Sequence, residues 1–557
     1  MKRSCLSRCT PLLLGSLLAL AAPLKGQGLL PERVGVGPAQ KKLSFRSAIQ
    51  TALVSNLEIE IEKTSTAIAQ LSIRAAQGAF DPSFRWLPGF ESHNTPVGSV
   101  LLGSDGKLSE TFHNQNFLFL QKIPWSGASF SVNFDNNRQT STNPFNSLNP
   151  LFNSRLFVNF TQPLWRNREI DPERAELRIR RKQFDISETE FELKVIDVIA
   201  RVEQSYWNLV AARQDVQVQE ESVKLAQEQF AQNQRMIEAG MLAPVELAAS
   251  KAELERRNDM WYSSVGRLTE VENTLKALLS ISRSDEIWKE EIIPLDDHVV
   301  EASPEIELSE AVAQALKGRP EMRLVSQRQE TNQIQKLFNA SQTKPQVNFV
   351  ASYGNTGLAG SLVSFQDDPF TQSNALLYGQ VNELSSIAGL PPLVPPSFGG
   401  VPPSLVGGYG TSLSNLFSGR YQSVLVGLAF ELNLRNRTAQ ANLAQSLVSE
   451  RRLKLEQSTV EQIIEIQTRN ALQETRTTRQ RITATSASVQ AAQEKLESET
   501  RLFQSGESTN FLVLTRQNEL SESRRRMVLA NLDFNRAVAR LGQALGTTLQ
   551  SHNITLK

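Results

Sequence analysis

Histidine is the side chain best suited to acid–base and metal chemistry near neutral pH. The four histidines of this 557-residue chain are scattered, at His93, His113, His298 and His552. Only His298 stands beside carboxylates, because it follows Asp296 and Asp297. A zinc site draws four ligands at short spacing, and no second histidine or cysteine stands near His298 in the sequence. We interpret the group as a solvated polar cluster and predict no metal site.

Other catalytic constellations are missing from the sequence. It contains neither a Gly-rich phosphate-binding loop nor a Gly-x-Ser-x-Gly nucleophile motif. Two basic clusters, 479–481 and 524–526, lie in helix-forming sequence, where arginines ordinarily face solvent or form ion pairs. A net charge of +1 gives no electrostatic reason to expect nucleic acid. We therefore predict that the chain is not an enzyme and binds no cofactor and no nucleic acid.

The N-terminus carries the pattern of an export signal. Basic residues precede a short apolar run over 11–22, which ends in small residues. This pattern predicts a secretory signal peptide over 1–27, since the run is short for a membrane anchor. The only two cysteines, Cys5 and Cys9, precede the apolar run, so the exported chain would contain no disulfide.

The longest uninterrupted element of the sequence is helical. Residues 173–239 contain no proline and no glycine, and a helix of this length spans about 100 Å at about 1.5 Å per residue. Gly240 suits a left-handed helix end and Pro244 suits the first turn of a following helix, so we expect a hairpin there. The first structural repeat, 28–281, is predicted to contain a helix over 43–78, strands within 80–163, the long helix over 173–239 and a returning helix over 244–281.

The strands predicted within 80–163 have two different faces. Polar and apolar residues alternate strictly over 129–135. In another strand, Leu156, Val158 and Phe160 share one face. Strands with one apolar and one polar face, joined by long polar loops, fit a transmembrane β-barrel and also a soluble sandwich. The strands alone leave both alternatives open.

The second half of the chain repeats the first. Ala311 follows Ala48 at an offset of 263 residues, and Gly506 follows Gly240 at an offset of 266. A repeat of this size indicates a duplication. The second repeat, 308–546, lies between a connector over 282–307 and a tail over 547–557. It is predicted to contain a helix over 308–341, strands over 346–354 and 421–432 around a long loop over 355–420, a long helix over 438–505 and a helix over 510–545.

Two features distinguish the second repeat. Gly318 and Pro320 are expected to break the helix over 308–341 near its start. The loop over 355–420 is long and rich in glycine, serine and proline, and such loops are usually functional or disordered. We interpret it as an external loop.

The order of these elements resembles the TolC-type outer-membrane efflux protein family, in a divergent branch. The stretches that carry the resemblance are 43–53, 162–168, 240–247 and 537–546. Each is weak as a string, but their order, spacing and duplication cover nearly all of the exported chain. The resemblance implies a mixed α and β membrane protein. Its long antiparallel α-helical hairpins would form an α-barrel with partner chains, and its strands would contribute to a shared transmembrane β-barrel.

The resemblance also implies an assembly. It implies a homotrimer in the cell outer membrane, with a large periplasmic portion that meets a periplasmic adaptor and an inner-membrane pump. Such a channel conducts substrates passively in tripartite efflux or in type I secretion, and nothing in the residues separates the two. Oligomerisation has an independent physical reason, because a few strands cannot close a barrel and open edges are not tolerated in lipid.

By the same resemblance, the hairpin turns over 239–247 and 505–513 form the periplasmic tip, where the channel opens and adaptors dock. Gly240 and Gly506 mark the two turns, and Glu246 keeps an acidic residue on the first.

The second turn departs from the family's better-known gate. Leu512 and Thr515 stand where other members can carry aspartate rings. Ser508 stands where an arginine can lock the closed state, and Phe503 takes the place of a tyrosine. Three copies of Leu512 would form an apolar constriction that gates by dewetting, or Leu512 packs between neighbouring helices.

One alternative keeps the export signal but removes the channel. An exported structural coiled-coil protein would remain soluble after cell lysis, whereas a membrane duct would require detergent.

Overall fold

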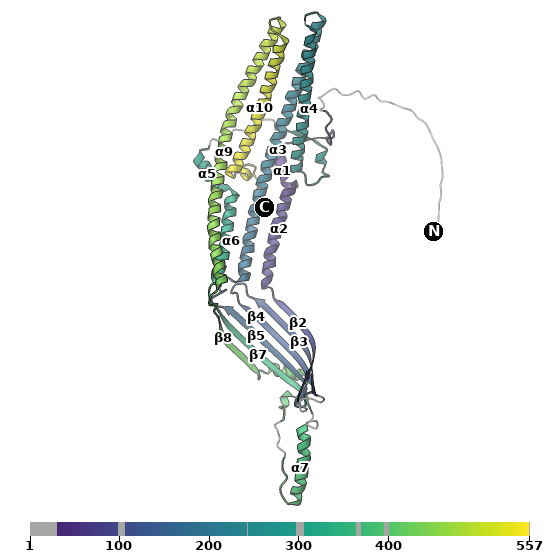
Figure 1. The fold of residues 1–557 in the computed structure, drawn as a ribbon, viewed down its shortest axis with the longest axis vertical. Coiled ribbons are helices and arrows are strands. Elements are labelled where there is room, and N and C mark those ends of the chain that lie inside the picture. Colours follow the sequence, from purple (N-terminus) through teal and green to yellow (C-terminus); the bar gives the residue numbers. More distant parts are fainter. Residues whose placement is uncertain are drawn as a thin grey trace, which may run out of the picture. The chain divides into compact units, whose positions relative to one another are not determined.

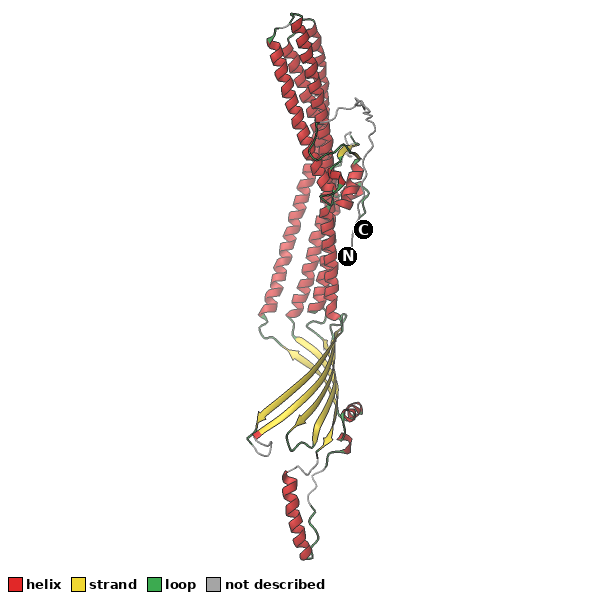
Figure 2. Cartoon of the chain, turned by 90° about the vertical axis from the view of Figure 1, so that its right-hand side faces the viewer, coloured by secondary structure: helices red, strands yellow, loops and turns green. Residues whose placement is uncertain are grey.

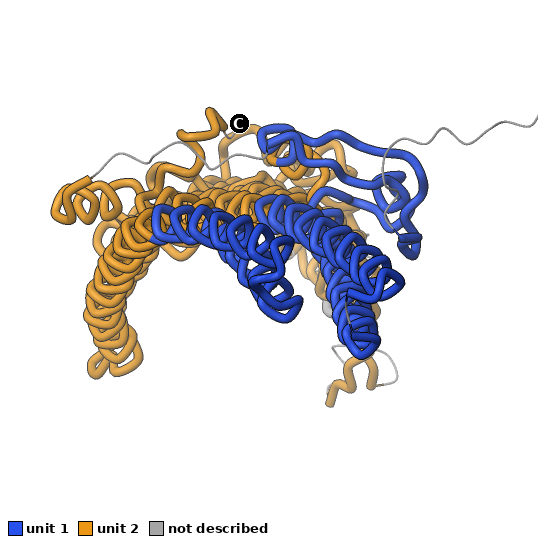
Figure 3. The backbone as a smooth tube through the Cα atoms, turned by 90° about the horizontal axis from the view of Figure 1, so that it is seen from above, with its two compact units in different colours: residues 1–48, 205–298, 481–532 blue, residues 49–204, 299–480, 533–557 orange. Residues whose placement is uncertain are grey.

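The structure is a computed structural model that describes residues 31–98, 106–241, 243–296, 306–363, 369–394 and 400–555. The predicted signal peptide over 1–27 and His298 lie outside the described residues. The chain divides into two compact units, coloured separately in Figure 3. Unit 1 comprises Met1–Ala48, Ser205–His298 and Arg481–Leu532, and unit 2 comprises Ile49–Gln204, Val299–Gln480 and Asp533–Lys557.

Unit 2 contains a six-stranded antiparallel sheet (Figure 1). Its order is β2-β3-β4-β5-β7-β8, so the strands occur across the sheet in the same order as along the chain. Aromatic and β-branched residues at every second position suit a pleated sheet with two distinct faces. The strands are β2 (Ser83–Pro96), β3 (Lys107–Lys122), β4 (Ser129–Ser141), β5 (Leu148–Pro163), β7 (Gln346–Leu362) and β8 (Gln422–Glu431).

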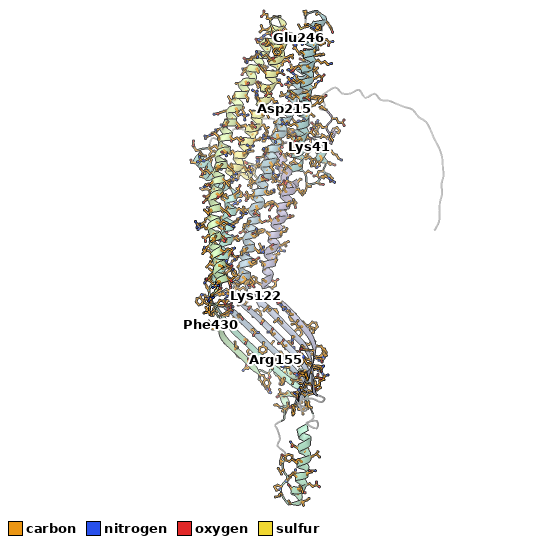
Figure 4. The ribbon with its side chains drawn as sticks, in the orientation of Figure 1. Lys41, Lys122, Arg155, Asp215, Glu246 and Phe430 are labelled. Atoms are coloured by element: carbon orange, nitrogen blue, oxygen red, sulfur yellow. The ribbon has the colours of Figure 1, made fainter. Side chains whose placement is uncertain are left out.

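The two faces of this sheet differ in polarity. Residues directly opposite in an antiparallel pair share a face, and the register sets Val132 opposite Val158 and Phe134 opposite Leu156. The face with these residues, here named the apolar face, carries a few polar side chains such as Gln115 and Arg138, but most of it is apolar: Phe84, Trp86, Phe90, Phe117, Phe119, Phe130, Val132, Phe134, Leu156, Val158, Phe160, Phe349, Tyr353, Val424, Val426, Leu428 and Phe430. The opposite face, here named the polar face, carries Ser131, Asn133, Asp135, Arg155, Asn159, Thr161, Ser352 and Ser423. Arg155 and Phe430, one from each face, are labelled in Figure 4.

The sheet has two open edges. Among the described residues, β2 pairs only with β3, and β8 pairs only with β7. The outer backbone groups of both edge strands therefore need partners from elsewhere if water is excluded from them.

Helices of unit 2 lie side by side in one layer, in the order α2-α3-α6-α9 (Figure 1). Ion pairs link successive helices: Arg201–Glu58 between α2 and α3, Lys182–Glu330 between α3 and α6, and Lys336–Glu450 between α6 and α9. Unit 2 also contains a buried apolar cluster, which includes Ala311, Leu472 and Leu541. The helices are α2 (Leu57–Gln77), α3 (Pro172–Glu238), α5 (Leu308–Gly318), α6 (Pro320–Gln342), α9 (Arg437–Gln504), α10 (Asn510–Leu545) and α11 (Thr548–Ser551).

Unit 1 contains the two helical hairpins that end in Gly240 and Gly506. The first joins the end of α3 to α4 (Val245–Leu279), and the second joins the end of α9 to α10. A short parallel pair of strands, β1 (Gln40–Leu43) and β6 (Glu291–Pro294), lies in the same unit. There Tyr206 packs against Phe45, and its hydroxyl donates a hydrogen bond to the carbonyl of Leu43 at 3.1 Å.

The helix expected over 43–78 is two helices, α1 (Phe45–Ser55) and α2. Asn56 interrupts it, because this residue has an extended backbone and its side chain accepts hydrogen bonds from the backbone N–H groups of Glu58 and Ile59. An asparagine in this role caps a new helix rather than continuing the old one. In the second repeat, the expected break is confirmed: α5 ends at Gly318 and α6 begins at Pro320.

The prediction of a long loop over 355–420 was wrong. β7 continues to Leu362, and the segment also contains α7 (Pro369–Ile387), a single turn over Pro403–Leu405 and α8 (Tyr409–Phe417). Small residues let these elements approach closely, since a Cβ atom on Gly360 would lie 2.7 Å from Cβ of Leu148. The same glycine and serine content had indicated a loop. In the connector over 282–307, the described part likewise contains β6.

Among the helices of the described residues, none has both the length and the apolar character needed to cross a membrane.

The Asn56 cap gives a first testable prediction. Asn56→Ala removes the acceptor for two backbone N–H groups and should cost about 1 kcal/mol of local stability. Amide hydrogen exchange at Glu58 and Ile59 should then be about fivefold faster. Asn56→Asp keeps an acceptor and is the matched control. Equal exchange in both variants would show that the side chain does not cap α2.

Candidate functional site: the two helical hairpin turns

The first hairpin turn closes the end of α3 with a left-handed residue. Gly240 has φ +74°, and its N–H donates to the carbonyl of Ile237 at 2.9 Å. The N–H of Met241 donates to the carbonyl of Met236 at 2.8 Å. These two bonds form a Schellman motif, which satisfies helix-end carbonyls and requires a positive φ that glycine adopts at no steric cost.

The second turn has the same backbone. Gly506 has φ +83°, its N–H donates to the carbonyl of Phe503 at 3.1 Å, and the N–H of Glu507 donates to the carbonyl of Leu502 at 2.9 Å. Both turns therefore reverse a long helix by the same hydrogen-bond pattern, at the positions that the sequence offset of 266 residues matches.

A buried polar cluster lies directly below the turns and joins the two hairpins. We name it the asparagine cluster: Gln229 and Asn233 of α3, Glu246 and Ser250 of α4, and Asn510 of α10. Oδ1 of Asn510 accepts from the side-chain amides of Gln229 at 3.1 Å and Asn233 at 3.0 Å. The amide of Asn233 also lies 2.6 Å from Oγ of Ser250. Since Asn233 is fully buried and Asn510 is only 2% exposed, these bonds replace contacts with water.

Glu246, a predicted tip residue, is hydrogen-bonded to the other hairpin. It lies in the first turn of α4 (Figure 4), and its Oε2 accepts a hydrogen bond from the side-chain amide of Asn510 at 3.0 Å. A carboxylate in the first turn of a helix is also favoured by the helix dipole.

The remaining predicted residues have separate environments. Ser508 donates a hydrogen bond to Glu499 of α9, and Arg516 forms an ion pair with the same carboxylate at 3.6 Å. Phe503 is buried, whereas Leu512 is 36% exposed. Thr515 uses its hydroxyl within α10, where it donates to the carbonyl of Phe511 at 2.8 Å.

A second polar group binds the hairpins further along α4. The guanidinium of Arg257 is buried and donates to the carbonyl of Ser222 at 3.0 Å and to the side chain of Asn518 at 3.2 Å. Burial would raise the pKa of Glu253, but hydrogen bonds from Arg256 and Arg257 outweigh it and hold that pKa at about 2. Glu253 is therefore ionised at neutral pH and balances the buried guanidinium.

Sequence analysis did not find the asparagine cluster. Its signal was present, because Gln229 and Asn233 are four residues apart on α3 and so share one helix face. Polar residues are so frequent on both long helices that this pair does not stand out without the partner from α10.

The three histidines among the described residues are not gathered into a site. His93 and His113 lie on β2 and β3, where each contacts a phenylalanine ring, and His552 contacts Glu203 in unit 2. Among the described residues, no group of three or more histidine, cysteine, aspartate or glutamate side chains is placed to hold a metal ion.

The comparisons with known proteins give a family for part of the chain and a fold for most of it. The family model described as "Outer membrane efflux protein" matches residues 131–280. No curated protein sequence matches the chain at a significant level. The resemblance to the outer-membrane efflux protein family is thus confirmed by a direct match within the chain, and this is a family of transport channels rather than enzymes.

Solved structures share the fold over most of the chain. The outer-membrane channel OprN is 11% identical and covers 90% of this chain and 90% of its own, with a TM-score of 0.60. The CmeC outer membrane channel of Campylobacter jejuni is 13% identical and covers 90% of this chain and 86% of its own, also with a TM-score of 0.60. VceC of Vibrio cholerae is 14% identical and covers 90% and 96%, with a TM-score of 0.57.

The asparagine cluster gives the second prediction. Asn510→Ala leaves the buried amides of Gln229 and Asn233 without their shared acceptor, which should cost about 1–3 kcal/mol. Hydrogen exchange should then become faster by tenfold or more in the two turns, over 236–250 and 503–513. Gln504→Ala, on the exposed end of α9, is the control and should change exchange little. Equal exchange in both variants would mean that the cluster does not hold the hairpins together.

Proposed function

We propose that the chain is one protomer of a homotrimeric outer-membrane duct that conducts substrates passively, in a tripartite efflux or type I secretion system. The observation that carries the proposal is the sheet of unit 2, with its exposed apolar face and its two open edges. In hydrocarbon, the backbone groups of an open edge would lack partners, so a membrane sheet must close into a barrel. Six strands are too few, and copies of the chain can supply the rest by pairing β8 with β2.

The dimensions and side chains of the sheet support a membrane location. The central strands β3, β4, β5 and β7 contain 13 to 17 residues, more than the roughly 9–11 that a tilted strand needs to cross the hydrocarbon core. Trp125 and Trp165 are exposed at the end of the sheet nearest the helices, and Tyr409 and Tyr421 are exposed toward the other end. Aromatic residues at both borders of an apolar band are typical of outer-membrane barrels.

The strand count supports a water-filled lumen. Three copies of the six-stranded sheet would supply 18 strands. Barrels of about 16–18 strands leave an aqueous channel, whereas barrels of about eight strands are filled by side chains. The polar face, with Asn133, Asp135 and Arg155, would line this lumen, and the apolar face would contact lipid.

The two hairpin turns are the proposed tip of the helical tunnel and its gate. The asparagine cluster ties the first hairpin to the second, so any opening that separates them within a protomer must break its bonds. The proposed tip residues are Gly240, Glu246, Phe503, Gly506, Ser508, Leu512 and Thr515. A periplasmic adaptor would dock on these turns, with an inner-membrane pump supplying the energy.

The proposal is tested by purification and by electrical recording. We expect the protein to require detergent, to have the mass of a trimer and to form channels in planar bilayers. Val426→Arg places a charge on the apolar face and should reduce insertion, by about 2–4 kcal/mol at mid-membrane. Ser423→Arg, on the polar face of the same strand, is the matched control. A protein that stays soluble after lysis and forms no channels would instead be the exported coiled-coil protein.

Leu512 gives a separate prediction about the gate. Its side chain is 36% exposed, whereas the adjacent Val513 is buried between this chain's own helices, so we propose that Leu512 lines the constriction. Leu512→Asp would place three carboxylates there and should raise cation selectivity and introduce block by divalent cations. Leu512→Asn, which matches aspartate in size without the charge, is the control. Unchanged conductance and no divalent block in the aspartate variant would show that Leu512 packs between helices.

A further inference from the structure

The short helix α8 lies on the apolar face of the sheet, near the end away from the long helices (Figure 2). Its Ser412 hydroxyl lies 3.0 Å from the carbonyl of Gly357 on β7 and 3.1 Å from Oγ of Ser154 on β5. Ser154 shares its face with Leu156 and Val158, since side chains alternate along β5. The helix therefore covers the side of the sheet that carries the apolar band, and it does not lie on the polar face.

The sheet beneath α8 differs from the rest of this face. Nearer the long helices this face carries mainly large apolar residues, such as Val132, Phe134 and Val158, whereas the floor under α8 is small or polar: Asn136, Ser154, Gly357 and Ala359. Ser154 and Ala359 are fully buried, and Oδ1 of Asn136 accepts a hydrogen bond from the hydroxyl of Tyr409 at 2.9 Å. A Cβ atom on Gly357 would lie 2.0 Å from the carbonyl oxygen of Ser412, so only glycine permits this approach.

The contacts of α8 satisfy the polar groups of this floor. The side-chain amide of Asn415 donates to the carbonyls of Leu358 at 2.9 Å and Ser404 at 2.7 Å, and Leu416 is fully buried against the sheet. Without α8, a polar notch would interrupt the apolar face, and exposed polar groups in lipid are costly.

The outward side of α8 is apolar. Phe417 is 71% exposed, and Tyr409 and Tyr421 are exposed at the two ends of the segment. No charged residue occurs over 401–419, and the first one is Arg420. This surface continues the exposed band of Tyr353, Val424 and Val426 on the neighbouring strands, whose lipid contact rests on the proposed function.

We infer that α8 is a lipid-contacting helix that packs on the outside of the barrel and restores its apolar surface over the notch. The outward side of α8 contacts lipid at the border between acyl chains and headgroups, in the membrane leaflet farther from the helical tunnel. Continuity with the band, absence of charge and aromatic residues at both ends favour lipid over water. Exposure of the Phe417 ring beside the apolar band would be unfavourable in water and is favourable in contact with lipid. Nor does α8 narrow the lumen, since it lies on the opposite face of the sheet.

Spin labelling in lipid nanodiscs tests this placement. In a full chain with Cys5 and Cys9 replaced by serine, single cysteines are introduced as Phe417→Cys, Val426→Cys and Ser131→Cys. The collision of each label with molecular oxygen, which concentrates in acyl chains, is compared with its collision with a water-soluble nickel chelate. We expect labels at positions 417 and 426 to favour oxygen, and the label at 131, on the polar face, to favour nickel.

The three sites separate failure of this inference from failure of the channel proposal. A nickel-favouring label at 417 with an oxygen-favouring label at 426 overturns the placement of α8 and leaves the membrane sheet intact. Nickel-favouring labels at both positions overturn the proposed function itself.

A second variant tests the packing that holds α8 in place. Gly357→Ala should displace the helix, so the label at 417 should become more mobile and its contrast between oxygen and nickel should fall at least twofold. Gly427→Ala is the control, because a Cβ atom there would meet no atom within 4 Å. An unchanged label at 417 in the Gly357→Ala variant would show that α8 does not pack on this floor.

Discussion

The open edges of the sheet are the constraint on which the rest of the protein depends. β2 presents 14 residues and β8 presents 10 residues whose outer backbone groups have no partner among the described residues. In a membrane, each unsatisfied backbone group costs several kcal/mol, which exceeds what side-chain packing along one edge can return. The pairing of one copy's β8 with the next copy's β2 removes both edges at once. In the proposed duct, a stable protomer in lipid would therefore require the assembly, and the same closure would bring together the helices that continue from the strands.

The hairpin ends are held together by buried polar interactions. The helices near the turns are held by the asparagine cluster and by Arg257, where apolar residues would pack more simply. Replacing a buried polar network by well-packed apolar residues is often neutral or stabilising, so such networks are weak evidence for stability alone. They do impose one geometry, because a small shift leaves buried donors unsatisfied. If the hairpin turns form the proposed gate, hydrogen bonds of this kind would hold one closed arrangement and release it as a unit.

Sequence patterns predicted the elements whose periodicity is continuous over many residues. After Pro172 at its first position, α3 contains no proline or glycine, and α9 contains neither. Each helix ends two residues before a glycine that adopts a positive φ. Patterns failed where a single side chain or a tertiary contact decides the structure. Asn56 divides a helix by capping it, and Gly357 serves a close helix–strand contact that its own sequence neighbourhood does not reveal. Asn510 shows the same limit at the site, since its role depends on two residues more than 270 positions away.

The numbers of strands and helices also agree with one another if three copies assemble. In unit 2, four helices, α2, α3, α6 and α9, form one layer that continues from six strands. Twelve helices at a spacing of about 8–10 Å form a ring of roughly 95–120 Å in circumference. Eighteen strands spaced about 4.8 Å apart and tilted by about 45° form a barrel of roughly 120 Å. Twelve strands with the same tilt would reach only about 80 Å, so a four-stranded protomer would need a larger tilt to match the helices. In the proposed assembly, six strands per protomer would let the barrel meet the tunnel at a similar width without that change.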